Sequence, residues 1–435
     1  MTARPAPQMR LVWLAVFAGL PALTLAGLSA AWILPGAAVL VVCVAIAVFD
    51  LIGGERRLER VEVLLPEALR LTKNVGGSLA ITIRNGSSAD RQLRLAVPLP
   101  EGIESPDRVR EVSVPPGDSR IDWPCTGTSR GDHPLDRIHL ECGSPLGLWS
   151  VRAAKPCACQ LRVYPNLRDR ATAALFLKMA DPGFRLRRQV GKGREFDNLR
   201  HYVAGDKFED IHWKATARRA FPIVKLFRVE HAQEVYAVID SSRLSARPGI
   251  LDSYVDAALH LALVAERQGD RFGLVTFSDR THRFVRAKSG LDHFRLCRET
   301  IYNLRAERVS PDFREVFTSL QLNLRRRCLL VFFTSLDDTL LAETFEREVA
   351  LVARRHLVLV NITESDSMRP LFAGEPPESV DSLYSGLAGQ MLRNRMRRLQ
   401  IGLEQRGVHL SLVTPGSIKT QVTTAYLDVK RRQVL

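Results

Sequence analysis

The chain has 435 residues, of which 46% are hydrophobic and 25% charged, and its 62 Lys and Arg against 47 Asp and Glu give a formal net charge of +15. Arginines are spread along the sequence without a basic stripe interleaved with aromatics, so composition argues against nucleic-acid binding. The charge instead indicates a position close to anionic lipid, and the length leaves room for two soluble domains beside a membrane segment.

The first predicted elements are two apolar helices within residues 11–52. Residues 11–49 contain no Asp, Glu, Lys or Arg, and this run is about long enough for two membrane crossings of ~20 residues each. A break rich in small residues at 27–31 divides it. Trp13 and Trp32 lie near helix ends, where indole rings favour the membrane interface. Pro21 lies inside the first helix and predicts a kink there.

The charges that flank this hairpin predict its orientation. Arg4 and Arg10 lie in the N-terminal residues 1–10, three arginines follow within 56–60, and the turn carries no charge. Because Lys and Arg concentrate on the cytoplasmic side, we expect both termini and the soluble domains in the cytoplasm. The alternative is a signal peptide cleaved near residues 29–31, which would leave a second apolar run at the new N-terminus.

The cysteines are expected to be reduced. Their number is odd, no two form a CxxC pair, and one lies in the apolar segment, which makes a poor disulfide framework. Cys157 and Cys159 share one face of a predicted strand, but a four-ligand thiolate metal site would need partners that the sequence does not offer. Core packing is therefore the expected role, and reduced thiols agree with a cytoplasmic location. The seven are Cys43, Cys125, Cys142, Cys157, Cys159, Cys297 and Cys328.

Residues 60–166 are predicted to form a β-sandwich. Short alternating runs such as Leu79–Ile83 and Leu93–Val97 recur, and turn signals such as Asn85-Gly86 separate them. Several short strands without helical periodicity in about 100 residues are typical of two packed antiparallel sheets.

Residues 233–435 are predicted to form a doubly wound α/β domain, because continuous apolar strands alternate there with amphipathic helices. Ligands bind such sheets outside the carboxyl ends of the strands, here the loops at 240–242, 277–279 and 334–338. The predicted strands are 234–240, 271–278, 282–287, 328–333, 357–363 and 408–413, and the predicted helices are 250–268, 291–307, 312–325, 340–355, 382–405 and one from 417.

The connector at 167–232 contains the most unusual stretch. From Gly193 to Arg218 it mixes many charges with large aromatics and shows no clean period. The large aromatics Phe196, Tyr202 and Trp213 are closely spaced in the sequence, which a loop surrounded by solvent would not require. A polar network with aromatic anchors indicates a packed interface, either between the domains or with a partner.

This stretch resembles the signature of a bacterial family, the "domain of unknown function 58" proteins. The pattern G-x-E-F-x-x-L-R-x-Y-x-x-G-D, continued by I-x-W-x-x-(S/T)-A-R, is specific at this length. The resemblance extends to Arg130-Gly131, to the run 145–149, to the α/β part and to the two-helix anchor. The matching residues are Gly193, Glu195, Phe196, Leu199, Arg200, Tyr202, Gly205, Asp206, Ile211, Trp213, Thr216, Ala217 and Arg218.

The resemblance implies that the α/β domain is von Willebrand factor A-like. It also implies a location in the bacterial inner membrane and a partnership with a MoxR-type AAA+ ATPase that assembles or matures other proteins. Many domains of this type hold Mg²⁺ through Asp-x-Ser-x-Ser, a Thr on a second loop and an Asp on a third, oxygen ligands that suit a hard cation.

The Mg²⁺ motif is degenerate in this sequence. Asp240 and Ser242 are in register, but Leu244 occupies the last motif position and Ser245 lies one residue off. A second loop at 310–312 offers only a serine in place of the Thr. The third loop has Ser335 at the Asp position and Asp337 just beyond. Mg²⁺ is possible on these residues; in the alternative interpretation Asp240 caps a turn, and Ser242 and Ser245 bond backbone N–H groups.

No catalytic constellation is identifiable, since the sequence lacks a Gly-x-Ser-x-Gly, Walker or His-Glu-x-x-His motif. His212 beside Trp213 has no assignable nucleophile. The favoured function is therefore a non-enzymatic, membrane-anchored adaptor or scaffold. One alternative is a metal-dependent hydrolase in which Asp206, Asp240 and Asp337 converge. The other is a cell-envelope structural protein that assembles through its own A-like domain.

Overall fold

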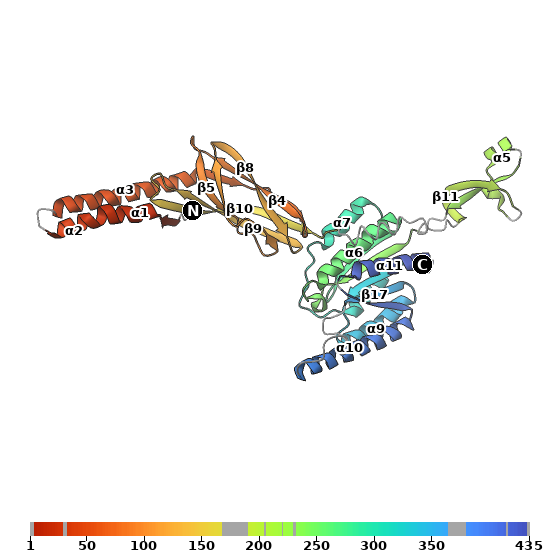
Figure 1. Ribbon diagram of the computed structural model, residues 1–435. Helices are drawn as coiled ribbons and strands as arrows, with labels where there is room; N and C mark the ends of the chain where they lie inside the picture. The colour runs from red at the N-terminus through yellow and green to blue at the C-terminus, as the bar shows by residue number, and fades with distance from the viewer. Residues whose placement is uncertain are drawn as a thin grey trace. The chain divides into compact units, whose positions relative to one another are not determined.

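A computed structural model describes residues 4–28, 33–167, 190–203, 206–219, 221–228, 232–363, 380–414 and 416–432, and Figure 1 shows its ribbon. The chain divides into two compact units, Met1–Asn166 and Leu167–Leu435. The first unit folds around one hydrophobic cluster, and the second unit has two further clusters of its own.

The helical part of unit 1 is interrupted near Pro21. It comprises α1 (Met9–Leu14), a π-helical turn (Ala15–Gly19), α2 (Leu20–Leu28) and α3 (Ile33–Glu59). Proline has no N–H to donate and its ring clashes with the carbonyl one turn earlier. A π-helical turn shifts that hydrogen-bond register, so the disturbance expected at Pro21 takes this form.

One helix in the described ranges, α3, is long and apolar enough to cross a membrane by length and composition; a shorter apolar helical stretch, Met9–Thr24, precedes it. Figure 1 shows α2 beside α3, and a Cβ placed on Gly19 would lie 3.9 Å from Leu40 Cδ2. The predicted second helix ended at residue 52, whereas α3 continues to Glu59. The reason is packing, because Asp50, Gly54 and Leu58 fall on one face and are buried.

The strands of unit 1 form two sheets whose side chains share one core. The alternation is clear in β4 (Gly76–Asn85), where Leu79, Ile81 and Ile83 are fully buried. One sheet has the order β1-β10-β9-β5-β7, with β3 pairing β10 in parallel, and the other has the order β2-β4-β8-β6. The remaining strands are β1 (Arg4–Pro7), β2 (Val61–Leu64), β3 (Ala68–Thr72), β5 (Arg91–Ala96), β6 (Ile103–Glu104), β7 (Arg110–Val114), β8 (Gly117–Gly127), β9 (Gly131–Gly143) and β10 (Trp149–Tyr164).

A buried carboxylate joins α3 to the turn between β9 and β10. Asp50 has no exposed surface and accepts three hydrogen bonds, from Ser144 Oγ at 2.5 Å, Leu146 N at 2.7 Å and Leu148 N at 3.1 Å. Trp149 Nε1 adds a bond to the carbonyl of Ala47 at 2.9 Å. The run at 145–149 that contributed to the family resemblance therefore forms the seat of this helix.

Unit 2 begins with a small module in the connector. β11 (Val190–His201) and β12 (Ile223–Arg228) pair antiparallel in a two-stranded sheet, and the chain between them contains a 3₁₀ turn (Phe208–Asp210) and α5 (Trp213–Arg219). Gly205 and the side chains of Glu195 and Phe196 lie outside the described part, so the prediction on them stays open.

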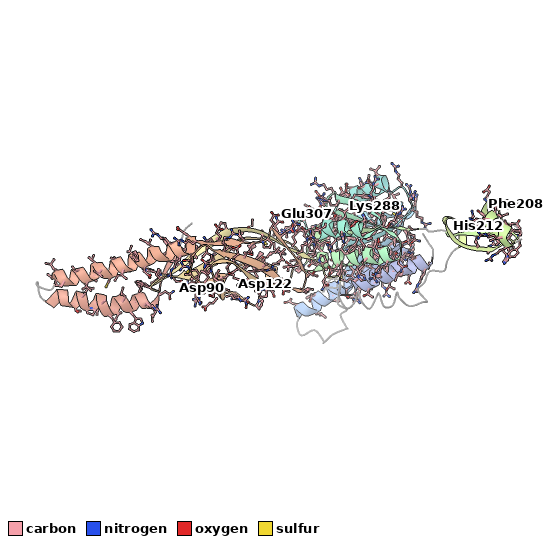
Figure 2. All side chains as sticks on the ribbon, turned by 90° about the horizontal axis from the view of Figure 1, so that it is seen from above. Asp90, Asp122, Phe208, His212, Lys288 and Glu307 are labelled. Atoms are coloured by element: carbon pink, nitrogen blue, oxygen red, sulfur yellow. The ribbon has the colours of Figure 1, made fainter. Side chains whose placement is uncertain are left out.

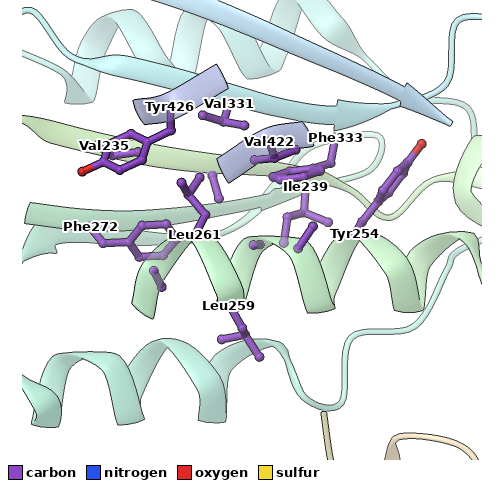
Figure 3. Packing of buried hydrophobic residues seen from close by; sticks show 14 of the residues in the cluster. Val235, Ile239, Tyr254, Leu259, Leu261, Phe272, Val331, Phe333, Val422 and Tyr426 are labelled. Carbon is purple, nitrogen blue, oxygen red and sulfur yellow. The ribbon is translucent and has the colours of Figure 1, made fainter. Parts of the chain in front are cut away.

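The α/β part of unit 2 is one sheet in the order β15-β14-β13-β16-β17-β18, parallel except for the edge strand β15. Figure 3 shows the core on one face, where Val235 and Ile239 of the central strand pack with Tyr254 and Phe333. The strands are β13 (Glu234–Asp240), β14 (Arg271–Phe277), β15 (Thr281–Lys288), β16 (Leu329–Thr334), β17 (Leu357–Thr363) and β18 (Val408–Val413). The helices are α6 (Ile250–Arg267), α7 (Leu291–Ile301), α8 (Phe313–Asn323), α9 (Thr339–Ala353), α10 (Val380–Glu404) and α11 (Ile418–Arg431).

One predicted helix is wrong at its end. The pattern predicted 291–307, but α7 stops at Ile301. After it, the backbone turns toward the first strand, and Glu307 N donates to the carbonyl of Ser241 at 2.7 Å. This long-range bond replaces a helical one and brings Glu307 to the carboxyl edge of the sheet.

Candidate functional site at the carboxyl edge of the sheet

The loop after β13 is organised by Asp240, which is fully buried. Its Oδ2 accepts from Thr334 Oγ1 at 2.6 Å, and its Oδ1 accepts from the backbone N–H of Ser242 at 2.8 Å. Burial raises the pKa of the Asp240 carboxyl, and the hydrogen bonds from Thr334 and Ser242 oppose that rise. Ser242 in turn accepts from Leu244 N at 3.3 Å and caps the 3₁₀ turn Arg243–Ser245.

Two arginines of this loop reach the third loop, which follows β16. Arg243 Nη2 donates to Asp338 Oδ2 at 2.8 Å and its Nε to Ser310 Oγ at 2.9 Å. Arg247 pairs with Asp337. The hydrogen bond from Arg243 is the main cause of the lowered pKa of Asp338, which also caps α9 by accepting from Leu340 N. The two ion pairs connect the first and third loops across the edge of the sheet.

These residues do not fit a Mg²⁺ site. The side-chain oxygens of Asp240 and Ser242 already accept hydrogen bonds from protein donors. Leu244 is largely buried in the core and has no oxygen to offer a metal ion. The guanidinium of Arg247 already neutralises Asp337. The positive charge of the arginines therefore balances the carboxylates of the third loop, a role that a bound divalent ion would otherwise have. The capping interpretation of Asp240 and Ser242 agrees with the observed bonds.

Some oxygens at this edge remain unsatisfied. Ser245 Oγ, Ser335 Oγ and Asp337 Oδ1 are buried and have no hydrogen-bond partner within the described residues. The expected bond from Ser245 to a backbone N–H is therefore not formed. Buried hydroxyls without partners are uncommon and mark a place that ordered water can fill.

The contacts of three residues of this site were missed by the sequence reasoning. Thr334, the last residue of β16, lies in the predicted loop 334–338, but the hydrogen bond from its hydroxyl to Asp240 was not foreseen. Arg243 and Arg247 were also missed, although each lies within seven residues of Asp240 and could have been noted as cations next to a supposed cation site. Their partners lie 95 and 90 residues away, and no local sequence pattern predicts such pairs.

The connector signature forms a local network. Arg200 Nη2 donates to Asp206 Oδ1 at 2.6 Å, and Val203 N donates to the other carboxylate oxygen at 2.9 Å. The bond from Val203, followed by that from Arg200, lowers the pKa of Asp206. Thr216 Oγ1 accepts from Ile223 N at 3.1 Å. Holding the connector module in shape is therefore enough to explain these three polar signature side chains. Among the described residues, no contact of the kind that the hydrolase alternative requires joins Asp206 to Asp240 or Asp337.

Aromatic side chains of the same module are open to solvent. Trp213 is 65% exposed and Phe208 73% exposed, and Tyr202 lies with its ring centroid 6.5 Å from that of Phe208. Figure 2 shows Phe208 and His212 on this module. His212 Nδ1 accepts from Ala215 N at 3.1 Å, which gives it a structural role at the start of α5. The exposed aromatics are suited to contact another surface.

Comparisons with known proteins agree with the family resemblance. Residues 198–371 match the profile of a family described as "Protein of unknown function DUF58", which confirms the family resemblance over this part of the chain. A comparison with curated proteins gave no match.

Solved structures similar to parts of this chain include three proteins of low sequence identity. The VWA domain of SpRpn10 is 11% identical, with 45% of this chain and 96% of that chain covered and a TM-score of 0.29. The conserved hypothetical protein BatB from Bacteroides thetaiotaomicron is 12% identical, with 46% and 99% covered and a TM-score of 0.30. The ASH/PapD-like domain of human CEP192 is 10% identical, with 25% and 87% covered and a TM-score of 0.19.

Proposed function

We propose that this DUF58 protein is a membrane-anchored adaptor whose A-like domain binds a protein partner through the carboxyl edge of its sheet. The observation that carries the proposal is the pair of arginines there. The side chains of Arg243 and Arg247 are each 45% exposed while they bond Asp338 and Asp337. A carboxylate of a partner can therefore approach guanidinium groups that are already held in place.

This edge would bind without a metal ion. In domains that use Mg²⁺, the open coordination position accepts a partner's carboxylate. Here Arg243 and Arg247 offer N–H donors to such a carboxylate instead, and Asp337 and Asp338 keep them oriented. The exposed Trp213 and Phe208 of the connector offer a second, apolar contact. The partner we propose is a MoxR-type AAA+ ATPase, which the family resemblance implies, and the role is assembly or maturation of other proteins.

The anchor would be the helical hairpin of unit 1 in a bacterial inner membrane. Apolar side chains of α3 face outward, with Leu34 82% exposed and Phe49 76% exposed, which suits contact with lipid. The strands before and after the helices, β1 and β2, both belong to the sheets of unit 1. That arrangement supports two crossings with both ends on the cytoplasmic side. Protease digestion of the C-terminus in inside-out vesicles, but not in intact spheroplasts, would agree; the reverse result would contradict the topology.

The partner contact is tested by co-purification of the full chain in detergent with the AAA+ ATPase encoded beside it. Changing Arg243→Ala and Arg247→Ala together should lower capture at least tenfold, whereas EDTA should have no effect. The control is Arg295→Ala, which removes an exposed, ion-paired arginine of α7. Asp240→Ala, which loosens the first loop, should also reduce capture. Capture that persists in the double variant and in Asp240→Ala would show that the proposed face is wrong.

A further inference from the structure

A second group of ligand-type side chains lies at the same edge, next to the Asp240 loop. Asp279 follows β14, His282 lies in β15, and Glu307 lies in the segment after α7. One ligand atom from each lies within 4.8 Å of the others. Ser241 links these segments through its backbone, because its N–H donates to Phe277 O at 2.7 Å and its carbonyl accepts from Glu307 N at 2.7 Å.

The spacing of these atoms suits a small transition-metal ion. His282 Nε2 lies 3.5 Å from Glu307 Oε2. Two ligands that bind one tetrahedral Zn²⁺ at 2.0–2.1 Å are about 3.4 Å apart. An imidazole with two carboxylates is a set that zinc accepts, whereas Mg²⁺ and Ca²⁺ prefer oxygen ligands alone. The arrangement therefore differs in chemistry, as well as in residues, from the degenerate Mg²⁺ motif.

The charge around the group is unbalanced. Both carboxylates lack a Lys or Arg partner in the part of the chain that the structure describes, although the chain as a whole has an excess of 15 positive charges. By contrast, Asp337 and Asp338 on the third loop are each paired with an arginine. Among the described residues, the basic group paired with Glu307 is His282, which is charged only when protonated.

A buried hydroxyl at the base of the group cannot satisfy all of its neighbours. Ser278 is fully buried, and its Oγ lies 2.9 Å from Asp279 Oδ1, 3.0 Å from Glu307 Oε2 and 2.5 Å from His282 Nε2. One hydroxyl has one proton, and an ionised carboxylate can only accept. At least one of the two oxygen–oxygen contacts therefore has no proton between its atoms. A cation bound to the carboxylates would remove that conflict.

We propose that Asp279, His282 and Glu307 bind one divalent transition-metal ion of the Zn²⁺ type. Three protein ligands leave a coordination position for water or for an outside carboxylate. Asp279 and Glu307 are exposed, so this position opens toward solvent at the edge where the loops converge. Metal binding here is independent of the partner proposed above, because it involves residues of this chain alone.

The test is calorimetric titration of Zn²⁺ into the full chain in detergent after treatment with EDTA. We expect one Zn²⁺ per chain, and we expect both His282→Ala and the isosteric Glu307→Gln to weaken binding at least tenfold. The matched control, Asp292→Asn, removes an exposed carboxylate of α7 and should change nothing. An absence of Zn²⁺ binding, or wild-type affinity in both ligand variants, would overturn the proposal.

Cobalt separates this site from binding by the cysteines. Co²⁺ bound by nitrogen and oxygen ligands should give ligand-field bands without intense sulfur-to-metal charge transfer, and the bands should be lost in Glu307→Gln. Charge-transfer bands that survive in this variant would mean that thiolates hold the metal. Displacement of Zn²⁺ by a small excess of Mg²⁺ would show that the carboxylates act without the imidazole. Either result would contradict the proposed ligand set.

Discussion

Two buried aspartates, one in each unit, are held in similar ways but in different surroundings. Asp50 of α3 and Asp240 at the end of β13 both have no exposed surface, and each accepts from a hydroxyl and from at least one backbone N–H group. Asp50 receives three donors, and the turn around it is closed by Trp149. Asp240 receives two donors, and unsatisfied hydroxyls of Ser245 and Ser335 lie in the neighbouring loops.

This difference indicates that Asp50 fixes the position of α3 on the strands, whereas the loops around Asp240 can change their contacts. A fully satisfied buried carboxylate fixes one geometry, since every change leaves donors without partners. An edge with spare oxygens and exposed guanidinium groups can exchange partners at lower cost. We therefore expect substitutions at Asp50 to act on folding and those around Asp240 to act on binding and on pH dependence.

The largest effect is expected for Asp50→Ala. Removing the carboxylate leaves Ser144 Oγ–H and the N–H groups of Leu146 and Leu148 buried without an acceptor, at about 1–3 kcal/mol for each group. The free energy of unfolding of unit 1 should fall by at least about 3 kcal/mol. Denaturant titration of the chain in detergent, followed through tryptophan fluorescence, measures it. Asp136→Ala, an exposed position on β9, is the control. Equal stability of the two variants would contradict the structural role given to the Asp50 hydrogen bonds.

A smaller effect is expected from restoring the metal motif. Leu244→Ser with Arg247→Ala supplies a hydroxyl at the empty motif position and frees Asp337 from its arginine. Mg²⁺ at ten times its dissociation constant should then raise the free energy of unfolding by about 1.4 kcal/mol. The comparison is made within the variant, with and without Mg²⁺, so the cost of replacing a core leucine cancels. If the wild-type protein shows the same Mg²⁺ response, the arginine has no part in excluding the ion.

The smallest effect is the pH dependence of Asp240→Asn. Because the folded pKa of Asp240 lies above its ordinary value of 3.8, the folded state binds more protons in the interval between them. Stability from this group is greatest below that interval and declines as pH rises through the raised pKa. The amide of Asp240→Asn does not titrate, so this decline should be absent. The stability of the variant relative to the wild type should therefore rise as pH increases. Unfolding measured from pH 4 to pH 8 checks the slope; parallel curves would contradict the raised pKa.

Local patterns were enough to predict the strands that form the sheet of unit 2. The predicted strand 234–240 has the same bounds as β13, and the predicted strands 357–363 and 408–413 have the bounds of β17 and β18. A continuous apolar run between polar ends defines a buried strand with little ambiguity. The positions of Asp240 and Ser335 at the carboxyl edge followed from the predicted strands 234–240 and 328–333.

Contacts between distant residues could not be predicted. Ser144, one of the partners of Asp50, lies 94 residues away from it, and Arg247 and Asp337 are 90 residues apart. The end of α7 at Ile301 depends on a bond to Ser241 that helical periodicity does not encode. The position of Glu307 beside His282 follows from that bond, which is why the proposed metal group was not visible in the sequence.

The unbroken course of α3 has a mechanical consequence. The helix has 27 residues, which corresponds to about 40 Å at 1.5 Å per residue, and it passes from an apolar stretch into the core of the strand unit without a hinge. Asp50 clamps it at that entry. Such a helix acts as a rigid rod, so a rotation or tilt imposed on its apolar end would turn the strand unit as one body.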